Sequence, residues 1–279
     1  VFMFHSNSLV VSRIFFSAFF ASLFASGISN AQDFEEITAN NGCPGCNLLL
    51  NSYRSLSIID ANFENTVLRE ADLKEARLEG ANFRNSDLRR TNMEKGIYSA
   101  ADFTGANMRG ADLEKSSLAD AIFTNADLRD VDFGESDLSN VDMSGADLRD
   151  VFMRRAKLDE ANITGVRMQH ADLERASANN ADFSNSNLES SDFSRVSVKG
   201  ASFINADFTF SNLSHSDFSG ADLSGAIFEN THMRATNFSG ADLSSASSLA
   251  PEQLALACGD EKTKLPEGFT IERCGTLGE

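Results

Sequence analysis

The fold is decided by residues 101–130, which read ADFTGANMRGADLEKSSLADAIFTNADLRD. Every fifth residue of this stretch is apolar, and the same spacing continues without a break from Phe63 to Leu243. The position two residues earlier, from Ala61 to Ala241, holds only Ala, Ser, Thr, Val or Gly. A period of five fits neither a helix, at about 3.6, nor an alternating strand, at about 2. It predicts a solenoid, in which stacked repeats bury one shared core.

A second period, of twenty residues, organises the first. Phenylalanine recurs at residues 63, 83, 103 and 123, and Asn or Gly fills one recurring position from Asn65 to Gly225. Asn and Gly tolerate the positive φ that a tight corner requires. Since side chains at i and i+2 of a strand share a face, the large residue and the small one before it both point inward. We therefore predict an all-β, four-sided parallel β-helix of about nine to ten coils.

The charge balance limits the class of partner. The chain of 279 residues carries 41 acidic and 24 basic residues, for a formal net charge of −17. Such a surface repels phosphate backbones, so we expect no direct binding to nucleic acid.

Residues 1–31 have the pattern of a secretory signal peptide. Phe, Ala and Ser dominate Leu9 to Ile28, Arg13 precedes the densest apolar stretch, and Ser29 and Ala31 are small residues at a cleavage site. The apolar run is short for a membrane span, which needs about 20 residues. We predict export to the periplasm or the extracellular space, with no membrane span after cleavage; an uncleaved anchor is the alternative.

Two pairs of cysteines flank the repeats. Cys43 and Cys46 stand in an irregular lead-in segment, residues 32–55, and Cys258 and Cys274 in a C-terminal cap, residues 249–279. Between these segments, residues 56–248 form the predicted β-helix. An oxidising compartment favours two local disulfides, the second worth ~3 kcal/mol by its loop length. A redox-active Cys43–Cys46 pair and a metal site remain alternatives. The cap opens with a predicted short helix from Pro251 to Cys258, because Pro suits a first helical position and Gly259 follows the last turn.

The outward positions supply the candidate functional residues. Arginines recur one coil apart at Arg69, Arg89, Arg109, Arg129 and Arg149, and apolar residues take normally polar places at Ile122, Phe152, Phe210 and Ile227. Asp stands two residues before three of these arginines, which favours ion pairing on a solvated face over an anion-binding ladder. The five arginines with Phe152 and Phe210 are the candidate interaction surface.

The run of Ala, Asp or Asn, then Leu or Phe, with two variable residues, resembles the pentapeptide-repeat family over residues 46–248. The resemblance implies a right-handed, four-sided β-helix. The segment from Cys43 to Asn47 and the tail from Ala257 to Cys274 look like the flanks of exported bacterial members. Many members have no known activity, and some cytoplasmic ones mimic DNA and bind a type II topoisomerase.

We therefore expect a non-catalytic scaffold of the cell envelope with no cofactor and no metal. The expected partner is another protein, and a homodimer is left open. The alternatives are an acidic DNA mimic that inhibits a topoisomerase, which would require the cytosol, and a thiol oxidant that uses Cys43 and Cys46.

Overall fold

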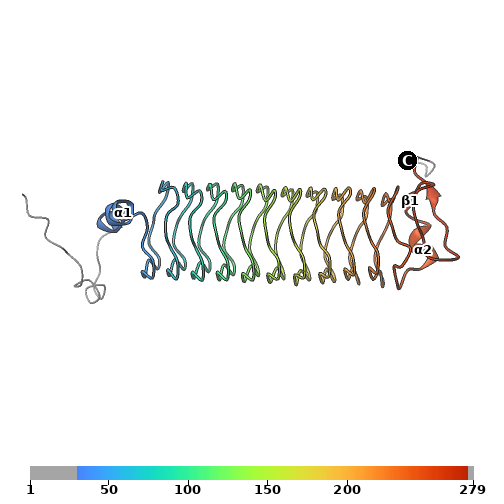
Figure 1. The fold of residues 1–279 in the computed structure, drawn as a ribbon, viewed down its shortest axis with the longest axis horizontal. Helices are drawn as coiled ribbons and strands as arrows, with labels where there is room; N and C mark the ends of the chain where they lie inside the picture. The colour runs from blue at the N-terminus through green and yellow to red at the C-terminus, as the bar shows by residue number, and fades with distance from the viewer. Residues whose placement is uncertain (1–29, 276–279) are drawn as a thin grey trace, which may run out of the picture.

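The computed structural model describes residues 30–275, with side chains from residue 34, and Figure 1 shows them as a long stack of coils with a helix at one end and a small cap at the other. The named elements are α1 (Asn30–Ala39), α2 (Pro251–Leu254), β1 (Cys258–Gly259) and β2 (Glu272–Arg273). The predicted signal peptide lies outside the described residues, apart from its last two. No helix in residues 30–275 has the length and apolar character that crossing a bilayer requires.

The predicted period of twenty residues is confirmed. Parallel bridges join residues twenty apart at every fifth position, from Gly42↔Asn62 to Ile227↔Ser247. Each side of the coil is a single bridged residue rather than a longer strand. Its backbone bonds both neighbouring coils: the N–H of Leu113 donates to the carbonyl of Asp132 at 2.7 Å, and the N–H of Asp112 to the carbonyl of Thr91 at 3.0 Å.

The corners are less selective than the sequence suggested. A positive φ occurs at corners occupied by Glu70 (57°), Arg90 (56°) and Asp120 (63°), as well as at Asn65 and Gly105. The left-handed conformation costs an ordinary residue about 1–2 kcal/mol. The packing of the whole coil therefore imposes the left-handed conformation at each corner. Asn and Gly are preferred at the corners but are not required there.

The core is the set of inward residues that the sequence identified. Phe83, Phe103 and Phe123 are fully buried, and the ring centroids of Phe103 lie 4.9 Å and 4.8 Å from those of its two neighbours. Ser and Thr at the small positions are also buried, and their hydroxyls bond backbone carbonyls, most of them in the preceding coil and a few three residues earlier in their own coil. The hydroxyl of Thr91 donates to the carbonyl of Leu68 at 2.8 Å.

The lead-in predicted for residues 32–55, with coiling expected from near Cys46, is more regular than expected. α1 covers its start, and the repeating bridges begin already at Gly42. Ile37 of α1 is buried against the core, with Phe34 partly buried beside it. An apolar end of a stack needs such a cover, and the short amphipathic pattern of α1 is too brief to stand out in the sequence.

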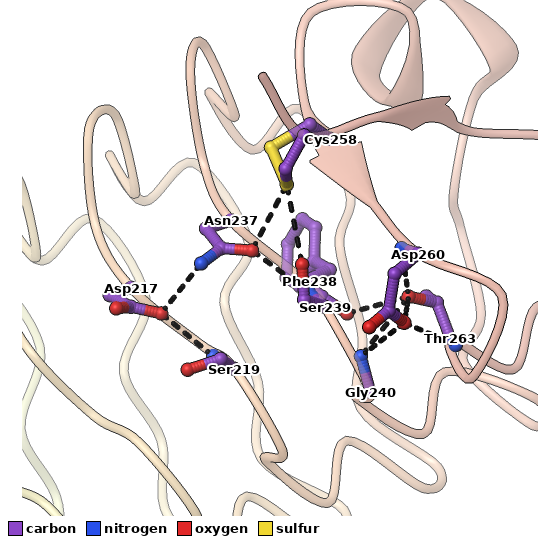
Figure 2. The surroundings of a disulfide bond; sticks show 10 residues. Asp217, Ser219, Asn237, Phe238, Ser239, Gly240, Cys258, Asp260 and Thr263 are labelled. Carbon is purple, nitrogen blue, oxygen red and sulfur yellow. Dashed lines mark hydrogen bonds between the residues drawn. A yellow bond between two sulfur atoms is a disulfide. The ribbon is translucent and has the colours of Figure 1, made fainter. Parts of the chain in front are cut away.

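The C-terminal cap continues the ladder in an irregular form. α2 ends at Leu254, not at Cys258 as expected, because the N–H of Cys258 donates to the carbonyl of Thr236 in the last coil at 2.9 Å. Figure 2 shows Asp260 near Gly240, whose N–H donates to its carboxylate at 2.9 Å. β1 pairs in parallel with β2, and the bridges Asn237↔Cys258 and Asp242↔Lys264 join this segment to the last coil.

Candidate interaction surfaces

Three arginines of the ladder are held by their own coil. Arg89, Arg129 and Arg149 each form two hydrogen bonds to the aspartate two residues earlier, at 2.5–2.8 Å. This fork geometry matches a guanidinium to one carboxylate. Those three groups are therefore occupied by internal ion pairs.

Asp147 is the most enclosed carboxylate of this face. Its residue is 8% exposed, and Arg167 of the next coil adds a hydrogen bond at 3.0 Å to the pair from Arg149. Burial alone would raise the pKa of Asp147, but the hydrogen bonds and charges of the two arginines lower it to about 2. The carboxylate is thus a structural anion at neutral pH.

Arg69 and Arg109 break the pattern, because Val67 and Asn107 stand where the others have Asp. Arg109 reaches instead to Asp130 of the next coil, Nε to Oδ2 3.0 Å. The Nε of Arg69 is buried and has no hydrogen-bond partner. A hollow of about 590 Å³ opens at this place, lined by Arg69, Glu70, Arg89, Arg90, Arg109, Gly110 and Asp130.

A second hollow, of about 510 Å³, surrounds Phe152. It is lined by Glu114, Asp132, Gly134, Glu135, Phe152, Arg154, Arg155, Asp172, Glu174 and Arg175. The ring is 49% exposed, although Asp132 and Asp172 flank it in the same column of the ladder. Gly134 provides the depth, since the coils before and after carry Glu114 and Arg154 at that position.

The charge around Phe152 is predominantly negative. Five carboxylates and three guanidinium groups line the hollow, and Arg154 is already bonded to Asp172 at 2.5 Å. Burial raises the pKa of the adjacent Asp112, and the nearby charges of Asp132 and Glu94 add to the increase. The hollow therefore favours a group that is both apolar and cationic.

The other sequence candidates lie apart from these hollows. Phe210 is 55% exposed at a corner with φ 60°. The structure bonds Cys43 to Cys46 and Cys258 to Cys274, at opposite ends of the stack. Among the described residues no group of three or more His, Cys, Asp or Glu is placed to hold a metal ion.

Both hollows lie where the outward columns of the sequence have exceptions, of which only Phe152 was among the predicted candidates. Val67, Asn107, Gly134 and Phe152 each interrupt an outward column, while the inward pattern beside them is unchanged. These exceptions mark both places in the sequence. The depth of each hollow, and the guanidinium that lacks a partner, depend on side-chain packing between coils, which the column pattern does not specify.

Comparison with known proteins agrees with this architecture. Among solved structures, HetL, a pentapeptide repeat protein involved in heterocyst differentiation regulation in the cyanobacterium Nostoc sp., is 22% identical with a TM-score of 0.53, covering 83% of this chain and 96% of that chain. A trypsin-treated form of QnrB1, a plasmid-mediated fluoroquinolone resistance protein, is 22% identical with a TM-score of 0.44, covering 75% and 92%. No curated protein matches the chain in sequence. The likeness to HetL shows a shared fold and nothing finer.

The family model described as "Pentapeptide repeats" matches in eight copies, over residues 58–94, 99–134, 136–175, 167–203, 181–220, 191–230 and 211–247. These segments span most of the coiled region, from the second coil to the last. The chain therefore belongs to the pentapeptide repeat family.

Proposed function

We propose that this rod is a non-catalytic scaffold of the cell envelope that binds a protein partner at the hollow around Phe152. The single observation that carries the proposal is an aromatic ring, 49% exposed, at the centre of a hollow rimmed by charged groups. Protein interfaces commonly have this arrangement, with an aromatic anchor at the centre and a polar rim.

The chemistry of the hollow defines the matching partner surface. The excess of carboxylates favours a basic side chain of the partner, placed beside an apolar one that covers the ring of Phe152. The proposal includes export, based on residues 1–31. It also includes a right-handed winding of about nine to ten coils, because nearly all parallel β crossovers are right-handed. It also assigns α2 to capping, because Leu254 is buried at the end of the stack.

A matched pair of variants tests the proposed surface. Phe152→Asn and Phe210→Asn each replace one exposed ring with a residue found elsewhere in the same column, at Asn92 and Asn230. Intact protein would be cross-linked in cells, purified from the envelope fraction, and its cross-linked partners quantified by mass spectrometry. We expect Phe152→Asn to lose at least one abundant partner that Phe210→Asn retains. Identical partner profiles for both variants and the wild type would refute the proposal.

The same material separates the alternatives. Recovery of uncleaved protein in the cytosol, together with inhibition of type II topoisomerase supercoiling by purified protein, would replace the scaffold with the DNA-mimic function. Oxidation of a dithiol substrate that is lost in Cys43→Ser would support the thiol-oxidant function. Light scattering across a range of protein concentrations decides between monomer and homodimer.

A further inference from the structure

The hollow beside Arg69 concentrates positive charge on an acidic rod. Four guanidinium groups line it, against the carboxylates of Glu70 and Asp130. Successive coils are joined directly there: the N–H of Glu70 donates to the carbonyl of Arg89 at 2.9 Å, and the N–H of Arg90 to that of Arg109 at 3.1 Å. The arginines are therefore stacked at about the 4.8 Å spacing of neighbouring strands.

Three of these four arginines form a direct contact with a carboxylate, and Arg69 does not. Arg89 is bonded to Asp87, Arg109 to Asp130, and a terminal nitrogen of Arg90 lies 3.6 Å from Glu70. Arg69 forms no direct ion pair with any of the described residues, because Val67 takes the place of its aspartate, although its charge still helps to lower the pKa of the neighbouring Asp87. Its buried Nε–H also lacks an acceptor, and an unsatisfied donor of this kind favours any rearrangement that supplies one.

The surroundings define the missing acceptor. With Asp87, which is bonded to Arg89, three carboxylates face the four guanidinium groups, so one further negative charge balances the hollow. Glu70 and Asp130 on its rim disfavour a doubly charged anion. Two apolar residues lie next to the hollow: Leu50, 65% exposed, donates its N–H to the carbonyl of Arg69 at 3.1 Å, and Val67 stands two residues before Arg69. Gly110 leaves the corner open where Arg90 and Asp130 occupy it in adjacent coils.

We propose that this hollow is a binding site for a single carboxylate attached to an apolar chain. The carboxylate accepts a forked pair of hydrogen bonds from Arg69, whose half-buried side chain turns to present Nε, and its apolar chain lies along Val67 toward Leu50. The carboxylate belongs either to a free organic acid or to an acidic side chain of a peptide. The assignment goes beyond the proposed function and does not depend on it, because the hollow around Phe152 is a separate site.

Three variants test the site from different directions. Arg69→Gln removes the unpaired cation. Val67→Asp supplies the internal partner that Asp87, Asp127 and Asp147 supply to their arginines, so it should fill the site from within. Gly110→Asn fills the open corner without changing a charge, and Asn tolerates its φ of 69°. Arg129→Gln is the matched control, because that arginine is bonded to Asp127.

The probes are sodium hexanoate and the single-carboxylate peptide N-acetyl-leucyl-glutamyl-leucinamide, titrated into intact protein at constant ionic strength. Binding is read from the 15N–1H signals of arginine Nε, with Arg69 assigned by its loss in Arg69→Gln. We expect saturable shifts of the Arg69 and Arg109 signals, unaffected in Arg129→Gln. In the three site variants affinity should fall by about tenfold or more, as loss of a charged hydrogen bond implies.

The probe that binds with higher affinity identifies the source of the carboxylate, a free organic acid or a peptide side chain. Higher affinity for either probe supports the site. The proposal is overturned if neither probe gives a saturable shift, if Val67→Asp binds as well as the wild type, or if inorganic phosphate binds more tightly than both probes. A loss of binding at the Phe152 hollow would leave these results unchanged, so failure of one proposal is distinguishable from failure of the other.

Discussion

Truncation of Phe103 to Ala is the most direct test of the stacked core. The ring is fully buried and stacked between Phe83 and Phe123, at centroid distances of 4.9 Å and 4.8 Å. The coils cannot collapse into the space, because backbone hydrogen bonds of 2.7 Å hold them on both sides, from Phe83 to Asp102 and from Phe103 to Ile122. A Phe→Ala change in a rigid site costs about 3–5 kcal/mol, and we expect about 4 kcal/mol here.

The assay combines urea unfolding followed by circular dichroism with hydrogen exchange read by mass spectrometry. Exchange is needed because neighbouring repeats can unfold separately, so a single transition does not locate the damage. Faster exchange should centre on the coils containing residues 83–123 and fade toward the ends. Phe152→Asn, at an exposed ring, should stay within about 0.5 kcal/mol of wild type. A loss below about 1 kcal/mol for Phe103→Ala, or equal losses for the two variants, would show that the inward column does not carry the stability.

The remaining predictions concern a buried ion pair, a disulfide and a corner. Because the pKa of Asp147 is lowered to about 2, its stabilising effect is present above its ordinary pKa and is lost as the pH falls through about 2. Asp147→Asn should therefore remove about 1–2 kcal/mol at neutral pH, allowing for solvent screening, and flatten the acid limb of the urea midpoint plotted against pH. A variant with an unchanged acid limb would contradict the assigned pKa. Cys274→Ser should lower cap stability by ~3 kcal/mol, with faster exchange confined to residues 251–275; exchange spreading into the central coils would contradict a local clasp. Gly220→Ala should lower the melting temperature more than Gly220→Asn, because φ is 69° while an added Cβ has no neighbour closer than 3.9 Å; equal effects would mean that φ is not the cause.

The core could be predicted from the sequence because one physical constraint repeats in it. An inward position between two stacked coils admits Phe103 or Leu113 but no charged group. An apolar residue therefore recurs at every fifth position from Phe63 to Leu243. The helix α1 could not be predicted in this way, because its sequence has no internal repeat and only Ile37 and Phe34 pack against the core. The early end of α2 could not be predicted for a different reason. The N–H of Cys258 bonds to the last coil and not within a helical turn, and this tertiary contact is not visible in the local sequence.

The outward columns follow a weaker rule, which makes their exceptions informative. Phe152 has one structural explanation, since it separates Asp132 from Asp172, and like charges facing each other across a ladder are destabilising. Yet Asn92 and Asn212 stand in the same column beside Asp112 and Asp192 and relieve the same repulsion with a polar side chain. Relief of repulsion therefore does not select an aromatic ring, and the fold gains little from a ring that is half exposed. The proposed contact with a partner would explain both its apolar character and its position in a hollow.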